Sequence, residues 1–265
     1  MTSDLVITTL TSASDNAAQI ATLTLNNPQR RNALSLEMIR ALDASLAEVS
    51  GDASTRVIVI RGEGPAFSAG HDLAEMQRER TETFYRELFG ACTNLMESVH
   101  RLRTPVVAQV HGVATAAGCQ LVAACDLAVC SDDARFATPG VNIGLFCSTP
   151  MVPISRAIGR KRALYMLLTG EMIGAQQAVD WGLVNQAVPS ADLAATVDSL
   201  ARKIANASPN VVSLGKLAFW NQIDDTEAAA YSKSGEVMCG NALLDDAHEG
   251  ISAFLEKRLP SWPPA

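Results

Sequence analysis

One run of small residues constrains how this chain can fold more than any other segment. It spans residues 112–120, reads Gly-Val-Ala-Thr-Ala-Ala-Gly-Cys-Gln, and follows a stretch, Val106–Val110, that predicts a β-strand. Side chains this small let a backbone turn sharply, approach a ligand closely and then open a helix. The first amides of a helix lack backbone acceptors, and with the helix dipole they attract a negatively charged oxygen. The run therefore predicts a strand, a turn and a helix, with a backbone anion site at the turn.

A second loop, further upstream, offers a matching donor. It follows the apolar run Val57–Ile60, which predicts another strand. Gly70 permits an unusual backbone angle, so the N–H of His71 can point into a cleft. Asp72 is suited to cap a helix that begins at Leu73. Two such amides would form an oxyanion hole, in which each donor lowers a barrier by roughly 2.7–4 kcal/mol.

The hydrophobic pattern predicts an α/β fold. Strands are predicted at Gln19–Leu25, Arg56–Arg61, Val106–Val110 and Leu127–Cys130. Between them the clearest helix is Leu36–Val49, where apolar residues recur every three or four positions and Ser35 can cap the start. From about Ala191 the pattern is helical only. We therefore predict a core over residues 1–188 and a helical region over 189–265, which the resemblance described below implies to be an oligomerisation region.

Composition narrows the class of partner. The chain has 265 residues, 48% of them hydrophobic, which is ample for a buried core, and its net charge of −7 argues against nucleic acid or an anionic membrane surface. No apolar run approaches the roughly 18 residues of a membrane span, and the first twenty residues lack signal-peptide features. We expect a cytoplasmic protein whose ligand is a small molecule.

The six cysteines show no paired Cys-x-x-Cys spacing, so we expect reduced, mostly buried thiols and no metal site. Cys147 differs from the others because it lies in the loop 142–150, close in sequence to the expected cleft. A role for Cys147 in catalysis is therefore kept open, beside the alternative of a plain loop.

Together, these motifs resemble the crotonase (enoyl-CoA hydratase/isomerase) superfamily over nearly the whole chain, from Thr22 to Lys257. The segments that carry the resemblance are Leu25–Pro28 with Asn32–Leu34, Phe67–Leu73, Thr104–Gly112, Ala116–Cys119, Leu168–Gly170 and Ala178–Val184. The chain is most similar to the subgroup of hydratase domain-containing proteins that also reads Gly-His-Asp-Leu and Ala-Gly-Cys-Gln.

The resemblance implies a crotonase-like spiral of ββα units followed by a C-terminal helical trimerisation region, assembled as a homotrimer or a dimer of trimers. It places oxyanion-hole N–H groups at His71 and Ala117, and coenzyme A enters as part of the substrate, with no permanently bound cofactor. The residues it implies for coenzyme A binding are Arg30, Arg31, Ala33, Ala69, His71, Asp72 and Leu73, with Phe254 and Lys257 supplied by a neighbouring subunit.

The chain departs from the family pattern at the two catalytic glutamates. Gln120 and Gly140 stand at those positions. Adding water to an enoyl thioester needs one group that activates water and one that handles the α-proton. Gln120 can hold water or substrate by a hydrogen bond but cannot accept a proton, and Gly140 has no side chain. We therefore expect weak or no standard hydratase activity.

Several functions remain open at this point. The first is an acyl-CoA enzyme that stabilises a thioester enolate in the oxyanion hole, with a malonyl-type decarboxylase as a specific form, because loss of carbon dioxide makes the enolate without a base. The second is a non-catalytic acyl-CoA-binding protein. The third is a hydratase with substitute groups, for which the side chains of His71 and Cys147 are the candidates.

Overall fold

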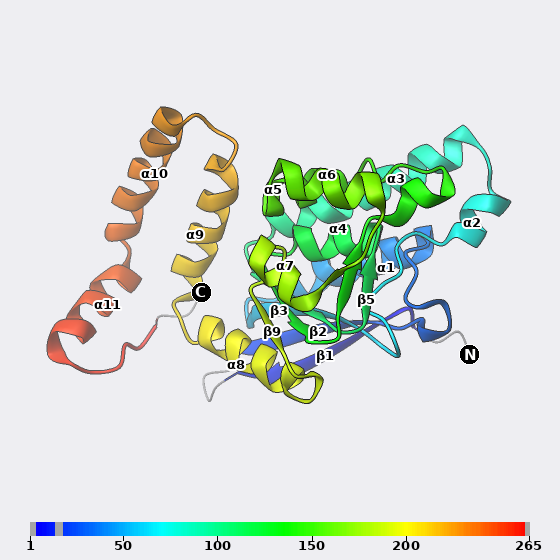
Figure 1. The fold of residues 1–265 in the computed structure, drawn as a ribbon. Coiled ribbons are helices and arrows are strands. Elements are labelled where there is room, and N and C mark those ends of the chain that lie inside the picture. Colours follow the sequence, from blue (N-terminus) through cyan, green and yellow to red (C-terminus); the bar gives the residue numbers. More distant parts are fainter. Residues whose placement is uncertain (1–3, 14–17, 263–265) are drawn as a thin grey trace.

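The computed structural model describes residues 4–13 and 18–262 and shows a layered α/β core with a helical extension (Figure 1). The strands are β1 (Val6–Ser12), β2 (Gln19–Leu25), β3 (Thr55–Gly62), β4 (Val106–Val110), β5 (Val113–Thr115), β6 (Leu127–Ser131), β7 (Arg135–Ala137), β8 (Ile173–Gly174) and β9 (Gln186–Val188). The helices are α1 (Leu36–Gly51), α2 (Leu73–Arg78), α3 (Glu82–Arg101), α4 (Ala117–Ala124), α5 (Met151–Ile158), α6 (Arg160–Thr169), α7 (Ala175–Trp181), α8 (Leu193–Ala205), α9 (Pro209–Gln222), α10 (Glu227–Ala242) and α11 (Asp245–Glu256).

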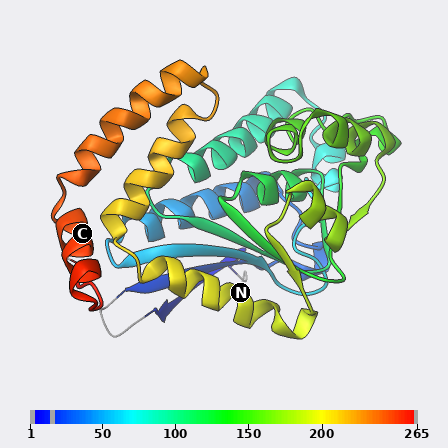
Figure 2. The same ribbon diagram turned by 60° about the vertical axis from the view of Figure 1, so that its left-hand side comes forward.

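Two sheets organise the core. The larger has the order β1-β2-β3-β4-β6-β9 and is parallel except for the β1–β2 pair, and the smaller has the order β5-β7-β8. Parallel strands are covered on both faces, which explains their continuous apolar sequences. Helices α1, α3 and α4 lie on one face of the larger sheet and α8 crosses the other (Figures 1 and 2).

The predicted strands are confirmed. β2 and β4 have the predicted bounds, and β3 and β6 extend the predicted strands by one residue at one or both ends. The helix predicted at 36–49 is also present, and the Ser35 Oγ accepts the N–H of Met38 at 3.1 Å, as expected of a capping serine. In the described part of the chain, no helix is both long and apolar enough to cross a membrane.

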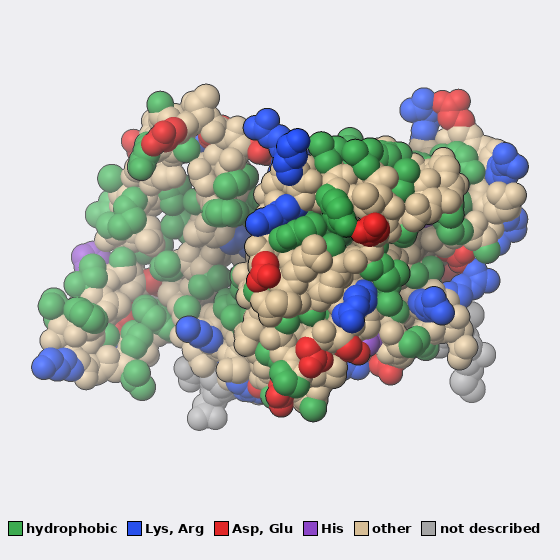
Figure 3. Space-filling model, viewed as in Figure 1, with side chains coloured by type: hydrophobic (Ala, Val, Ile, Leu, Met, Phe, Trp, Pro, Cys, Tyr) green, Lys and Arg blue, Asp and Glu red, His purple; other side chains and the backbone are tan. Residues whose placement is uncertain are grey.

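The chain is helical beyond residue 192, as predicted, but its helices occupy two different environments. Helix α8 buries Leu193, Val197 and Ala201 against the sheet. Helices α10 and α11 extend away from the core (Figure 1) and present hydrophobic side chains to the outside (Figure 3). The division of the chain into 1–188 and 189–265, and trimerisation through the second part, stay predictions.

A buried ion pair fixes α9 to the core. The Lys216 ammonium lies 2.7 Å from the Asp126 carboxylate and also donates to the carbonyls of Val99 and Thr104, at 2.8 and 2.9 Å. The other Asp126 oxygen accepts the indole N–H of Trp220 at 2.8 Å. These contacts pair the buried charges completely, as a water-poor site requires.

Candidate functional site

The loop that ends at His71 packs directly against the beginning of α4. Gly70 has a φ of +89°, and a Cβ placed on it would lie 2.8 Å from the Ala116 Cβ and 3.1 Å from the Ala117 nitrogen. Only glycine fits this position without strain and without a clash. Gly70 therefore brings the chain just before His71 against the first amide of α4, as the sequence predicts.

Backbone hydrogen bonds join this loop to the segment that precedes α4. The Ser68 amide donates to the Val113 carbonyl at 3.2 Å, and the Thr115 amide donates to the Ser68 carbonyl at 3.0 Å. The Thr115 hydroxyl donates to the Ala69 carbonyl at 3.0 Å. A Cβ on Gly118 would lie 2.3 Å from the Ser68 oxygen, so a small residue is required there too. The two loops form one rigid unit.

The turn into α4 is strained at Ala116. Its backbone angles are φ 50° and ψ −119°, a region that residues with a Cβ rarely adopt, and its N–H is held by the Ala137 carbonyl at 2.9 Å. This strain was not foreseen, since the sequence there reads as ordinary alanine. Within the described ranges, neither the His71 N–H nor the Ala117 N–H has a hydrogen-bond acceptor. Each of the two loops therefore has one free amide donor.

These donors lie at the wall of an apolar cavity of about 360 Å³. The wall brings together six of the residues that the sequence singled out, namely Ala69, His71, Leu73, Ala117, Gly140 and Cys147. The rest of the wall comes from Phe89 of α3, Ala116 and the segment 139–150. No Asp, Glu, Lys or Arg is among the lining residues, so the titratable groups of this wall are one imidazole and one thiol.

The His71 imidazole is held in one orientation. Its Nδ1 lies 3.2 Å from the Leu34 carbonyl, and the ring meets Phe89 edge-on with centroids 5.5 Å apart. Its Nε2 is buried and has no hydrogen-bond partner. Burial lowers the pKa of His71, and the hydrogen bond to Leu34 opposes that shift only in part, so the ring is neutral at pH 7.

The position of the second missing glutamate has no room for any side chain. A Cβ on Gly140 would lie 1.9 Å from the Leu145 carbonyl oxygen and 2.9 Å from the Cys147 sulfur. The turn closes because the Leu145 amide donates to the Gly140 carbonyl at 2.9 Å. Burial raises the pKa of Cys147, with a backbone hydrogen bond from Gly140 opposing it, so the sulfur is a neutral thiol.

Gln120 lies beside this cavity and not in its wall. Its side chain is 3% exposed, and its Oε1 lies 4.0 Å from the Cys92 sulfur of α3. Gln120 lines a neighbouring cavity of about 470 Å³ between α3, α5 and α9, and Thr149 borders both cavities. Gln120 lies three residues beyond Ala117, almost a full helical turn, and its side chain points towards α3. The hydrogen bond to substrate or water that the sequence suggests for Gln120 requires its side chain to face the cleft, and this placement differs from that.

The residues expected to bind coenzyme A divide between two places. Arg30 pairs with Asp72 at 2.5 Å, while the other Asp72 oxygen accepts the amides of Ala74 and Glu75 and so caps α2, as predicted. Arg31 is exposed beside this pair, and Ala33 is buried.

Phe254 and Lys257, also expected to bind coenzyme A, lie at the end of α11, which extends away from the core (Figure 1). Phe254 is 83% exposed. The expected role of these two residues requires a neighbouring subunit and stays a prediction.

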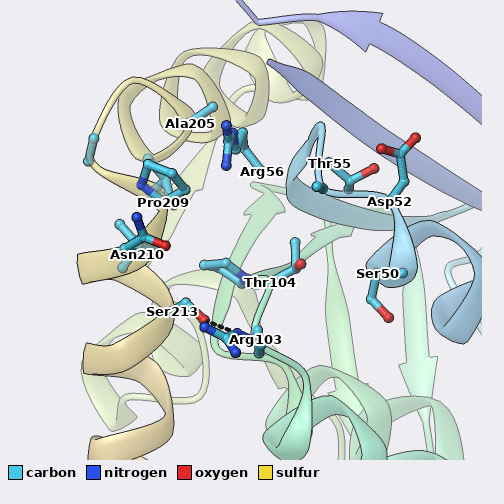
Figure 4. A pocket seen from close by; sticks show the side chains of 16 residues that line it. Ser50, Asp52, Thr55, Arg56, Arg103, Thr104, Ala205, Pro209, Asn210 and Ser213 are labelled. Carbon is cyan, nitrogen blue, oxygen red and sulfur yellow. Dashed lines mark hydrogen bonds between the residues drawn. The ribbon is translucent and has the colours of Figure 1, made fainter. Parts of the chain in front are cut away.

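Another cavity, of about 350 Å³, lies at the end of β3 opposite the candidate site (Figure 4). Arg56 and Arg103 flank it, and Arg103 donates to the Ser213 hydroxyl at 3.0 Å. Ligands of parallel α/β sheets bind beyond the carboxyl ends of the strands, and this cavity is at the amino ends. The apolar cavity is therefore the better candidate site. Among described residues, no group of three potential ligands could hold a metal ion.

Known proteins resemble this chain over almost its full length. The family model described as enoyl-CoA hydratase/isomerase matches residues 15–264. Human enoyl-CoA hydratase domain-containing protein 3, mitochondrial, is 48% identical over 243 residues, which cover 92% of this chain and 80% of that protein. Its crystal structure superposes with a TM-score of 0.91 at 46% identity, covering 96% of this chain and 99% of that one.

A solved enoyl-CoA hydratase from Mycobacterium smegmatis gives a TM-score of 0.92 at 46% identity and covers 97% of this chain and 98% of its own. The crotonase-like fold predicted from the sequence is thereby confirmed. The cytoplasmic location stays a prediction, because the name of the human relative includes the word mitochondrial.

Proposed function

Because the chain belongs to the enoyl-CoA hydratase/isomerase family, we propose that it binds acyl-CoA thioesters and stabilises the thioester enolate with the backbone N–H groups of His71 and Ala117. One observation carries this proposal: His71 and Ala117, whose amides have no acceptor, line the same apolar cavity. Such donors are most effective where the surroundings exclude water and the donors need no rearrangement.

The chemistry follows from the charge that develops on the substrate. When a bond at the α-carbon breaks and leaves its electron pair, negative charge moves to the thioester oxygen. The Ala117 N–H is the first amide of α4, so the helix dipole adds to its effect. The rigid pairing of the two loops keeps both donors in place before the charge appears.

Standard hydration is not favoured by this cavity. Its wall offers no carboxylate to activate water. Gln120, which stands at the position of the first missing glutamate, is a neutral amide that lines a neighbouring cavity. General acid and base groups contribute typically 10²–10⁴-fold each. We expect hydration of crotonyl-CoA to be slower than that of a conventional family hydratase by orders of magnitude.

Decarboxylation of a malonyl-type thioester is the second candidate. Loss of carbon dioxide produces the enolate directly, so the reaction needs the oxyanion hole and no base. The absence of carboxylates from the cavity wall favours it, because a carboxylate would repel the substrate's own charge in an apolar site. A protein that binds acyl-CoA without turnover is the remaining alternative.

Coenzyme A and the oligomer belong to the same proposal. Arg30 and Arg31 are exposed and supply positive charge to a chain whose net charge is −7. Lys257 and Phe254 of a neighbouring subunit would complete this site, with α10 and α11 in the contact of a homotrimer or a dimer of trimers. The exposed hydrophobic side chains Tyr231, Met238, Leu243, Phe254 and Leu255 support it, because a monomer gains nothing by exposing them.

The test compares three substrates with one protein. Crotonyl-CoA reports hydration, a malonyl-type CoA ester reports decarboxylation, and a saturated acyl-CoA in D₂O reports exchange of the α-proton. The variant Ala117→Pro removes one N–H at the first position of α4, whose amide makes no bond within the helix, and should lower turnover by about 10²–10³. Ala117 is buried, so acyl-CoA binding by the same variant must show that the turn is intact. Turnover of none of the three substrates, with acyl-CoA still bound, would leave only the binding function, and unchanged turnover in Ala117→Pro would exclude the oxyanion hole.

A further inference from the structure

The cavity wall contains one side chain that could accept a proton at neutral pH, the imidazole of His71. The His71 Nε2 is buried without a hydrogen-bond partner, and His71 is one of the residues that line the cavity. Burying a polar atom without a hydrogen-bond partner costs free energy, so the burial of Nε2 needs an explanation. One explanation is that an atom of the bound substrate supplies the missing partner.

The Leu34 carbonyl decides which ring nitrogen is free. A carbonyl only accepts, so the neutral imidazole carries its proton on Nδ1 and donates it to Leu34 over 3.2 Å. Nε2 then has a lone pair and lies on the side of the ring away from Leu34. The edge-on contact with Phe89 prevents the ring from turning over freely.

The other titratable group of the wall is less suited to this task. The Cys147 thiol is protonated and would have to lose its own proton before accepting another. The nearest carboxylate in sequence, Asp72, is engaged by Arg30 and by two amides at the start of α2. His71 is therefore the one ring or side chain of the wall with a free lone pair of suitable basicity.

From these contacts we infer that the imidazole of His71, and not only its backbone amide, is a catalytic residue that takes the α-proton of the bound acyl-CoA. This inference rests on the proposed function. The α-carbon–hydrogen bond breaks, its proton goes to Nε2, and its electron pair forms the enolate whose oxygen is held by the two N–H groups. The imidazolium keeps its Nδ1–H bond to Leu34 and returns the proton in the reverse step.

The step needs no oxidant and no further reactant, because the imidazolium gives a proton back to the α-carbon in the reverse step. In D₂O it gives back a deuteron when the Nε2 proton has first exchanged with solvent. It also explains how one residue can serve twice: the backbone amide holds the oxygen while the side chain handles the adjacent α-hydrogen. The substrate class is any acyl-CoA that carries a hydrogen at its α-carbon, saturated chains included.

The experiment measures deuterium uptake at the α-carbon of butyryl-CoA in D₂O by NMR. The variants His71→Phe and His71→Asn keep the backbone N–H, so they leave the oxyanion hole intact and remove only the base. We expect both to lower the exchange rate by about 10²–10⁴-fold, while the affinity for butyryl-CoA changes less than about threefold. His111→Phe is the matched control, because His111 also bonds a backbone carbonyl, that of Gly64 at 2.7 Å, but lies outside the cavity.

The possible outcomes distinguish failure of the imidazole's role from failure of the proposed function. Exchange by the His71 variants at the native rate overturns the role of the imidazole and leaves the enolate function standing. The same holds if Cys147→Ser loses exchange and the His71 variants keep it. Binding without exchange in the native protein also overturns the role of His71, and absence of acyl-CoA binding removes the proposed function itself.

Discussion

The glycine at the second missing glutamate position gives the sharpest structural prediction. Replacing Gly140 by alanine places a Cβ 1.9 Å from the Leu145 carbonyl oxygen, and that oxygen belongs to the backbone, so no side-chain rotation relieves the contact. Extra atoms in a well-packed site cost about 1–3 kcal/mol, and a contact with backbone belongs at the upper end of that range. We expect Gly140→Ala to lower the free energy of unfolding by about 2–3 kcal/mol, which is about 5–10 °C in Tm.

The assay is denaturant unfolding of both proteins at one protein concentration, with Gly90→Ala as the control. Gly90 lies in α3, and a Cβ placed on it would meet nothing within 4 Å. Alanine there should raise stability by about 0.5–1 kcal/mol, because glycine disfavours a helix interior. A Gly140→Ala protein within about 0.5 kcal/mol of the native one, where ordinary surface substitutions fall, would refute the argument that the Leu145 turn fills this position.

The remaining predictions use other parts of the molecule. Gln120→Glu alone should leave hydration of crotonyl-CoA within about tenfold of the native rate, because the side chain at position 120 lines the neighbouring cavity and not the candidate site, as an absorbance assay would show. Lys216→Met should cost about 3–5 kcal/mol of unfolding free energy, since it leaves a buried carboxylate unpaired, and an unchanged midpoint in denaturant would contradict this. Burial raises the pKa of Cys147, so alkylation at pH 8 should label the exposed Cys239 well before Cys147, as peptide mass spectrometry would resolve. Light scattering at micromolar concentration should report a trimer or hexamer, and a stable monomer would contradict the proposed role of α10 and α11.

Four of the six strands in the main sheet could be predicted because they carry apolar runs, whereas β1 and β9 were not predicted. β2, β3, β4 and β6 have five to eight residues each, most of them buried, which gives a clear signal. The small sheet was not predicted. Its strands β5, β7 and β8 have two or three residues each, too few for any periodicity to appear. They matter for the site, since β5 and β7 carry the turn that leads into α4.

The local features of the site could be predicted where a residue acts through its own backbone. Gly70 is such a case, since its φ of +89° follows from the need for a sharp turn before His71. The Asp72 cap of α2 is another, because the carboxylate bonds amides only two and three residues away. Both features depend on residues close together in sequence, so the residue types at neighbouring positions are enough to predict them.

Contacts between distant residues could not be predicted in this way. The Arg30–Asp72 pair joins positions 42 residues apart, and no spacing rule connects them. The direction of Gln120 depended on where α3 packs against α4, which brings Cys92 to its side chain. The occupation of the Gly140 position by the Leu145 carbonyl depended on the course of a loop whose sequence reads only as irregular.

That loop connects the missing carboxylate to the character of the whole cavity. The turn that brings the Leu145 carbonyl onto Gly140 also brings the Cys147 sulfur beside it and places Ile143 and Phe146 in the wall. A glutamate cannot be restored at 140 without opening this turn, and opening it would remove part of the apolar lining. An apolar wall holds water poorly, and a poorly hydrated site strengthens hydrogen bonds to a developing enolate. Loss of the glutamate and exclusion of water therefore act in the same direction, against adding water to a double bond and in favour of chemistry at the α-carbon.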